Sequence, residues 1–158
     1  MGKKKKMWEV LSTSEINSVL EKVDIFKGAY PSDLLPIHIR KDTQAYIINT
    51  ADSNHPGEHW IAIVLDENQC LYFDSFGYQL LNLDILNKIK KAGVLQYQFN
   101  NKQIQPFQSE NCGYYCIAFI LSCQNGVTFS KFLNNFSTNP EENNVICYEL
   151  IKNNMFYS

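Results

Sequence analysis

Residues 59–65 read HWIAIVL, a stretch so rich in apolar and β-branched side chains that we expect a central strand of a sheet. Residues 66–68 (DEN) then predict a turn, and residues 70–74 (CLYFD) predict an antiparallel return strand. Upstream, residues 45–50 (AYIINT) have the composition of another buried strand, connected to the first through the polar loop 51–58. The middle of the chain is therefore predicted to form an antiparallel sheet.

Farther from this centre, most segments have helical patterns. Ser12 and Glu15 have capping-box spacing ahead of a short helix with one apolar face, whose apolar positions extend to Val23. Residues 27–36 predict an ordered loop, because Gly, Pro, Ser and Asp interrupt them. The other predicted elements are a helix from residue 83 that stops at Gly93, a strand over 95–99, and helices over 112–125, 128–133 and 139–153. The predicted fold class is α+β, with a central antiparallel-rich sheet of four to five strands packed by helices.

The length and composition fit one folded domain. The chain has 158 residues, of which 45% are hydrophobic and 19% charged, so it can bury a core and wholesale disorder is excluded. Its apolar runs are far shorter than a bilayer span, so we expect no contact with a membrane. Lys3 to Lys6 supply four of the fourteen basic charges, and without them the net charge of −2 becomes −6. We expect a basic N-terminal tail over residues 1–11 and a single, mildly acidic domain over residues 12–158.

The five cysteines are not expected to form a disulfide framework. Their number is odd, we recognise no signal peptide, and the apolar content suffices for a core, so a reducing, intracellular setting is favoured over secretion. The sequence contains no CxxC pair, which argues against a zinc site. It also contains neither GxxxxGK nor GxGxxG, which argues against a phosphate or dinucleotide loop. We expect no metal and no cofactor.

Three residues form the candidate catalytic constellation. His59 begins a predicted strand and Asp74 ends the next one, so an antiparallel pairing brings them to the same edge of the sheet. There a carboxylate can hold an imidazole in one tautomer and stabilise its protonated form. Cys112 begins a predicted helix, where unpaired N–H groups and the helix dipole favour a thiolate. A protonated His59 nearby would complete an ion pair ready for nucleophilic attack.

Two further features fit the same chemistry. Gly113 leaves room for a substrate backbone to pass close to the Cys112 sulfur. The polar loop over residues 105–111 (QPFQSEN) can bring a glutamine amide toward the same point. Together with the Cys112 backbone N–H, that amide would form an oxyanion hole.

Each of these residues also has an ordinary structural explanation. A histidine at a strand start is often structural, and Asp74 can belong to a simple turn over residues 74–77. On a helix, Cys112 would lie at the N-terminal end of an apolar stripe, where solvent can reach it. The other cysteines are assigned to core packing: Cys70, Cys116, Cys123 and Cys147.

Taken together, the motifs resemble a known family. The sequence HW at residues 59–60, DSFG at 74–77, and Gln105 seven residues before Cys112-Gly113 are similar, in this order, to the adenovirus protease (adenain) family of the Ulp1-like cysteine peptidase clan. The viral maturation proteases of virophage- and Maverick-type elements are the branch it resembles. The likeness extends over residues 12–153 and implies an adenain/Ulp1-like fold, so that residues 12–158 are one cysteine peptidase domain.

The resemblance implies a role for each matching residue. Cys112 would be the nucleophile, His59 the general base and acid, and Asp74 the carboxylate that orients His59. The adenovirus enzyme has glutamate at the orienting position, and the Ulp1-like branch has aspartate, as here. Either carboxylate can accept the imidazole N–H.

The resemblance also assigns the surroundings of the nucleophile. Gln105 would be the side-chain donor of the oxyanion hole, with Gln108 as a competing residue that lies closer to Cys112 in sequence. Trp60 would form a wall of the substrate groove, or alternatively pack elsewhere on the opposite face of its strand.

Three functions follow as expectations. The first is an endopeptidase that cleaves at small-residue or glycine-containing sites and matures viral capsid proteins. The alternative is a Ulp1-like isopeptidase that removes a ubiquitin-like modifier such as SUMO, ubiquitin or NEDD8. A third, from another class, is a binding module that has kept the fold and lost the activity.

The first function implies partners and a setting. The partners would be capsid or other structural proteins, and the enzyme would act as a monomer, without an activating disulfide partner, in the host cytoplasm or viral factory and in the virion. The run from Lys3 to Lys6 is open to two interpretations, a weak nucleic-acid contact or a solvated tail.

Overall fold

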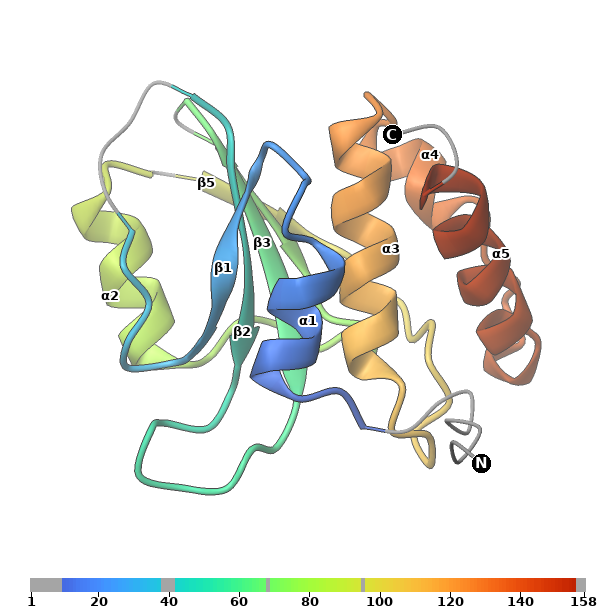
Figure 1. Cartoon of the computed structure of the whole chain (residues 1–158), viewed down its shortest axis with the longest axis horizontal. Coiled ribbons are helices and arrows are strands. Elements are labelled where there is room, and N and C mark those ends of the chain that lie inside the picture. Colours follow the sequence, from blue (N-terminus) through green and yellow to red (C-terminus); the bar gives the residue numbers. More distant parts are fainter. Residues whose placement is uncertain (1–9, 38–41, 68, 95, 156–158) are drawn as a thin grey trace.

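A five-stranded sheet forms the centre of the computed structural model, which describes residues 10–37, 42–67, 69–94 and 96–155 (Figure 1). The strands lie side by side in chain order: β1 (Phe26–Pro31), β2 (Gln44–Asn49), β3 (Trp60–Asp66), β4 (Gln69–Phe73) and β5 (Gln96–Phe99). The two central pairings, β2 with β3 and β3 with β4, are antiparallel, whereas both edge strands run parallel to their neighbours. The predicted α+β class with four to five strands is confirmed, and the sheet is mixed.

Strand β3 is apolar throughout because both faces of the sheet are covered. Its side chains alternate between two hydrophobic cores. Trp60, Ala62 and Val64 belong to one core, and Ile61, Ile63 and Leu65 belong to the other. Helix α2 (Leu83–Lys91) contributes Ile85 and Ile89 to the second core and lies on that side of the sheet (Figure 1).

The remaining helices cover the opposite face (Figure 1). They are α1 (Thr13–Val19), α3 (Cys112–Gln124), α4 (Phe129–Leu133) and α5 (Asn143–Met155), with a 3₁₀ turn η1 (Pro140–Glu142) ahead of α5. Helix α3 is apolar on nearly all sides because it lies between β3 and α5, in contact with both. Within the described residues, no helix is long and apolar enough to cross a membrane.

Two local predictions were wrong. Residues 27–36 are not only a loop, because residues 26–31 form the edge strand β1. Glycine and proline are tolerated there because an edge strand needs fewer ladder hydrogen bonds. The register with β2 is irregular between Phe26 and Gly28, and Gly28 has a positive φ of +138°. Helix α1 ends at Val19, so Val23 is buried through the turn that follows and not through the helical face.

The N-terminal boundary differs from the predicted tail of residues 1–11. The lysines Lys3 to Lys6 lie outside the described residues. Leu11, in contrast, is only 6% exposed and packs into the core beside Trp60. The backbone carbonyl of Leu11 also accepts a hydrogen bond of 3.0 Å from the Trp60 indole N–H. The packed body of the protein therefore includes Leu11.

Candidate active site

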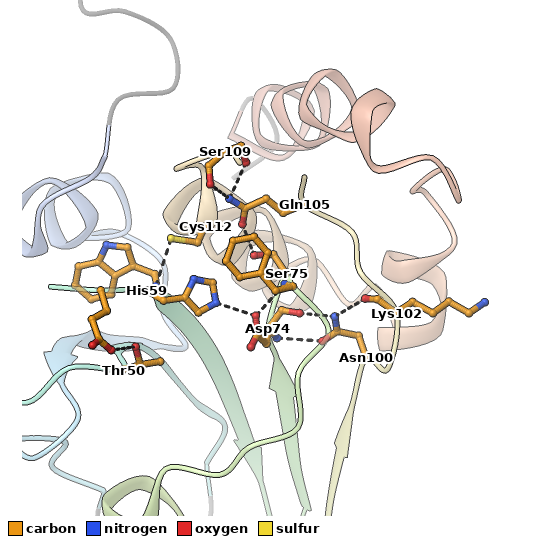
Figure 2. A network of polar contacts seen from close by, with 12 residues as sticks. Thr50, His59, Asp74, Ser75, Asn100, Lys102, Gln105, Ser109 and Cys112 are labelled. Atoms are coloured by element: carbon orange, nitrogen blue, oxygen red, sulfur yellow. Dashed lines mark hydrogen bonds and ion pairs between the residues drawn. The ribbon is translucent and has the colours of Figure 1, made fainter. Parts of the chain in front are cut away.

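His59 and Asp74 meet at one edge of the sheet, as the antiparallel pairing of β3 and β4 predicts. His59 directly precedes β3 and Asp74 directly follows β4. The His59 Nε2 atom lies 2.8 Å from the Asp74 Oδ1 atom, and the side chains are 16% and 5% exposed. Because Nε2 faces the carboxylate, Nδ1 is the ring nitrogen left for Cys112. Figure 2 shows the imidazole between the Cys112 sulfur and the Asp74 carboxylate.

The end of β5 fixes the backbone of Asp74. Parallel strands end at the same edge of a sheet, so Asn100, directly after β5, reaches the residue that follows β4. The Asn100 amide accepts a 3.0 Å hydrogen bond from the Asp74 N–H and donates one to the Asp74 carbonyl. Gly77, at φ +79°, keeps the next turn close, since an added Cβ would lie 2.6 Å from the Lys102 carbonyl carbon. The orienting carboxylate is therefore held by the fold itself.

Phe76 completes the support of the histidine. Its backbone N–H donates a 2.9 Å hydrogen bond to the same Asp74 Oδ1 atom that contacts His59. Its ring stacks on the imidazole with centroids 4.6 Å apart and an interplanar angle of 17°. The imidazole is thus fixed in its plane by Phe76 and in its direction by Asp74.

Cys112 is the first residue of α3, as predicted, and is 7% exposed. Asn111 at the N-cap makes no side-chain capping hydrogen bond, and its carbonyl accepts the N–H of Tyr114, so the N–H groups of Cys112 and Gly113 are the ones that the first turn can offer to a bound group. The Trp60 backbone N–H donates to the Cys112 sulfur at 3.4 Å. Such donors stabilise negative charge on sulfur, in addition to the positive end of the helix dipole.

The electrostatics of the pair favour a charged histidine. Burial lowers the pKa of His59. The hydrogen bonds to Asp74 and Cys112 and the negative charges of these two groups act in the opposite direction and are stronger, so the pKa is raised to about 9. At neutral pH the imidazole is therefore protonated, and it places a positive charge beside the Cys112 sulfur.

The other four cysteines have a different environment. Cys70, Cys116 and Cys147 are at most 1% exposed, and Cys123 is partly buried against the same core as Cys116. Burial raises the pKa of Cys70 and of Cys123 to about 12 and raises those of Cys116 and Cys147 as well. These thiols are neutral core side chains.

Gln105 is fully buried and held from both ends of its amide. The Ser75 hydroxyl donates to the Gln105 Oε1 atom at 2.5 Å, and the Gln105 Nε2 atom donates to the carbonyl and to the hydroxyl of Ser109, at 2.8 and 2.7 Å. The backbone N–H of Gln105 also donates to the Ser75 carbonyl. Gln108, the competing residue, is exposed. The structure therefore places Gln105, and not Gln108, in a buried polar network beside Cys112 (Figure 2).

Trp60 and Gly113 are placed differently from one another. Trp60 lines a cleft of about 610 Å³ that also includes Cys112 and His59, although most of its indole is buried in the core. Gly113 faces the core, because an added Cβ would lie 3.2 Å from Leu11 and 3.3 Å from Trp60. The packing thus gives glycine at position 113 a reason other than the predicted passage of a substrate.

Four residues of the site were not predicted from the sequence: Ser75, Phe76, Asn100 and Ser109. Ser75 and Phe76 stand in the DSFG motif, where adjacency to Asp74 is a usable signal. Asn100 and Ser109 are common polar residues in loops, and their spacing carries no motif. Only the convergence of the β4 and β5 ends and of the loop before α3 makes them part of the site.

The fold agrees with comparisons to known proteins. The family described as adenovirus endoprotease matches residues 24–150, which is most of the chain. Among solved structures, the chain is similar to the selenomethionine form of the African swine fever virus (ASFV) protease, with a TM-score of 0.52 and 17% sequence identity. That alignment covers 87% of this chain but only 66% of the ASFV protease, and at this identity the likeness concerns the fold. No curated protein sequence matches. On the family match, the chain belongs to the adenovirus endoprotease family of cysteine proteases.

Proposed function

We propose that this protein is a cysteine endopeptidase in which Cys112 is the nucleophile, His59 the general base and acid, and Asp74 the orienting carboxylate. The observation that carries the proposal is the imidazole of His59, held 2.8 Å from the Asp74 carboxylate and next to a cysteine at a helix N-terminus. All three side chains are largely buried, which strengthens their electrostatic interactions, and Cys112 and His59 still line a cleft.

In the first half of the reaction, the Cys112 thiolate attacks the carbonyl carbon of the scissile peptide, and the π electron pair moves onto the carbonyl oxygen. The tetrahedral intermediate then collapses, the C–N bond breaks, and the His59 imidazolium gives its proton to the leaving nitrogen. The products are a free amine and a thioester on Cys112. Asp74 keeps Nδ1 directed toward the reacting atoms throughout.

In the second half, neutral His59 takes a proton from a water molecule, which attacks the thioester carbonyl. The C–S bond breaks, the carboxylic acid leaves, and the thiolate–imidazolium pair is restored. Each of the two tetrahedral intermediates carries an oxyanion. The backbone N–H at the start of α3, that of Cys112, supplies one donor, and the network around Gln105 supplies the side-chain donor.

The proposed substrates are viral capsid proteins with small-residue or glycine-containing cleavage sites. Family membership supports a protein substrate. The position of the sulfur supports a narrow site, since Cys112 is only 7% exposed and shares the lining of the cleft with Trp60. A chain without large side chains can approach such a buried sulfur most closely.

The test is incubation of the purified protein with capsid proteins encoded by the same genome, with Cys112→Ala as the control. We expect cleavage at discrete sites by the wild type and none by the variant. Equal processing by both would contradict the proposal. Efficient turnover of SUMO or ubiquitin fluorogenic substrates, with the capsid proteins left intact, would favour a deconjugating peptidase instead.

The setting is also part of the proposal. The enzyme acts as a monomer in the host cytoplasm or viral factory and in the virion, where its substrates assemble. Lys3 to Lys6 add at most a weak nucleic-acid contact, because four charges meet few phosphates. Replacing all four lysines with alanine should weaken binding to duplex DNA at low salt and leave peptide cleavage without DNA unchanged. Unchanged DNA binding in this variant would assign the four lysines to a solvated tail.

A further inference from the structure

Three aromatic rings form a continuous surface beside His59. The ring of Phe76, which stacks on the imidazole, has its centroid 5.5 Å from that of Phe107 and 6.3 Å from that of Tyr78. Tyr78 and Phe107 stack on each other, with centroids 6.1 Å apart and an interplanar angle of 16°. We call Phe76, Tyr78 and Phe107 the aromatic platform.

The two outer rings of the platform are open to solvent. Tyr78 is 59% exposed and Phe107 is 56% exposed. They belong to different loops, since Tyr78 follows β4 and Phe107 precedes α3. Scattered single apolar residues are common on protein surfaces, whereas a contiguous exposed patch indicates a binding surface. Two loops that are far apart in sequence thus present one apolar surface next to the proposed base.

The platform lies on the leaving-group side of the site. In the proposed mechanism, His59 gives its proton to the leaving nitrogen, so this nitrogen comes within hydrogen-bond distance of the imidazole. The residue after the scissile bond carries that nitrogen, and its side chain begins only two bonds away. Phe76 stacks on the same imidazole and also lines the cleft, so it connects the cleft to the two exposed rings. A substrate side chain that begins beside His59 can therefore reach the platform.

We propose that the aromatic platform binds the side chain directly after the scissile bond and selects a large apolar residue there, with an aromatic ring favoured. The inference rests on the proposed function. A substrate ring can pack against Tyr78 and Phe107 in an offset or edge-to-face arrangement, and covering their exposed apolar surface is itself favourable. The two sides of the scissile bond then differ: small residues approach the buried Cys112 sulfur, and a bulky residue follows on the open surface.

The experiment uses acyl transfer, because it isolates the leaving-group side of the site. The p-nitrophenyl ester of N-acetyl-glycyl-glycine first acylates Cys112 and releases p-nitrophenol, which takes the proton of His59. The thioester then partitions between water and an added amino acid amide. The amide nitrogen attacks the thioester carbonyl, its proton passes to neutral His59, and the C–S bond breaks. This attack reverses the departure of an amine, so the added amide takes the place of the residue after the scissile bond.

The two amides are phenylalaninamide and alaninamide, which both carry a Cβ and differ only in the ring. They compete in one mixture at equal concentrations of free base, and the ratio of the two peptide amides is measured by liquid chromatography. Because both amides compete for the same thioester, this ratio does not depend on the rate of acylation. Aminolysis of the N-acetylcysteamine thioester of the same peptide gives the chemical baseline.

The variants remove the two exposed rings. They are Tyr78→Ala, Phe107→Ala and the double variant, each checked by circular dichroism. Phe76 is kept, because it supports His59. Tyr148→Ala, on the exposed surface of α5, is the matched control for loss of a surface ring.

We expect the wild type to favour phenylalaninamide by on the order of tenfold over the chemical baseline, the low end of what apolar contacts contribute to substrate selection, because the platform is open on one side. Each single replacement should lower the ratio by roughly threefold, and the double variant should return it to the baseline. Tyr148→Ala should keep the wild-type ratio.

A wild-type ratio at the chemical baseline, with a normal burst of p-nitrophenol, would overturn this inference and leave the proposed function standing. A preference for phenylalaninamide that survives in the double variant would also overturn it, since another surface would then bind the ring. A wild type that gives no burst, and so no thioester, would overturn the proposed function, and this inference with it.

Discussion

Cys112 and Cys116 are one helical turn apart on α3, yet their surroundings differ completely. Cys112 is 7% exposed and Cys116 is fully buried, a small difference in area. Cys112 lies on a cleft beside His59, and its sulfur accepts the Trp60 N–H. Cys116 lies under the sheet, where burial raises its pKa well above the ordinary value for a thiol. The two cysteines share the residue type, the helix and near-complete burial, so the proposed difference in reactivity rests on the neighbouring histidine and on the opening to the cleft.

The difference has a structural origin in the two ends of α3. Its first turn is where the start of β3 and the loop after β5 converge, so polar groups from distant segments surround it. From the second turn onward, the sheet and α5 cover the helix, and Cys116 packs in the hydrophobic core. One helix thus carries two thiols in different surroundings, one on the cleft and one in the core.

The largest effect should separate the two thiols by activity. Cys112→Ala removes the nucleophile and should lower kcat by roughly 10⁶-fold, as loss of a catalytic nucleophile does. Cys116→Ala should stay within a few-fold of the wild type. Steady-state cleavage of a capsid-derived peptide measures both, with circular dichroism to confirm folding. A folded but inactive Cys116→Ala would show that the wrong thiol has been assigned.

A second prediction asks whether the contrast depends on Asp74. Asp74→Asn keeps the shape but cannot hold His59 as an imidazolium, so kcat should fall by on the order of 10⁴-fold with the fold intact. Alkylation by iodoacetamide, mapped by mass spectrometry, should slow at Cys112 and stay unchanged at Cys116. Near-wild-type turnover would refute the role of Asp74.

The charge on His59 should make the free energy of unfolding depend on pH. The pKa of folded His59, about 9, lies above its ordinary value of 6.5. Its charged form therefore stabilises the folded state fully below pH of about 6.5, and this contribution is lost as the pH rises through about 9. The shift corresponds to roughly 3 kcal/mol. Urea unfolding of wild type and His59→Gln should give free energies of unfolding whose difference shrinks by about this amount between pH 6 and pH 10. A constant difference would contradict the charged histidine.

The smallest effect concerns the inert thiol. Cys116 packs within the core formed by the sheet and the helices α1, α3, α4 and α5, so Cys116→Ala should lower the free energy of unfolding by on the order of 1 kcal/mol. Urea denaturation at pH 7 measures it. Ser130→Ala, at an exposed position, provides the baseline. A loss no larger than that baseline would mean that Cys116 contributes nothing to packing.

Much of the fold could be predicted because strong local patterns coincide with tertiary structure. The β3–β4 hairpin and α3 are apolar enough that only a buried strand or helix fits them. The meeting of His59 and Asp74 then follows from antiparallel pairing alone. Strand β1 was missed because its glycine and proline suit a loop equally well, and only its parallel pairing with β2 makes it a strand.

The support of the site could not be predicted, for a different reason. Asn100 contacts Asp74, 26 residues earlier in the sequence, and Ser109 contacts Gln105, four residues earlier. Neither contact gives the sequence a periodic pattern. The role of Gln105 was inferred from its resemblance to the family, whereas its two-sided contact with Ser75 and Ser109 depends on how two loops pack. Polar loop residues gain meaning only from tertiary structure.

Asp74 and Ser75 are consecutive in the chain, and each touches a different part of the machinery: one holds His59 and the other holds Gln105. Their Cα atoms are separated by the fixed span of one peptide unit, about 3.8 Å. A shift of the backbone at the end of β4 would therefore reach both His59 and Gln105. One peptide unit thus connects the group that holds the imidazole to the group that holds the buried amide.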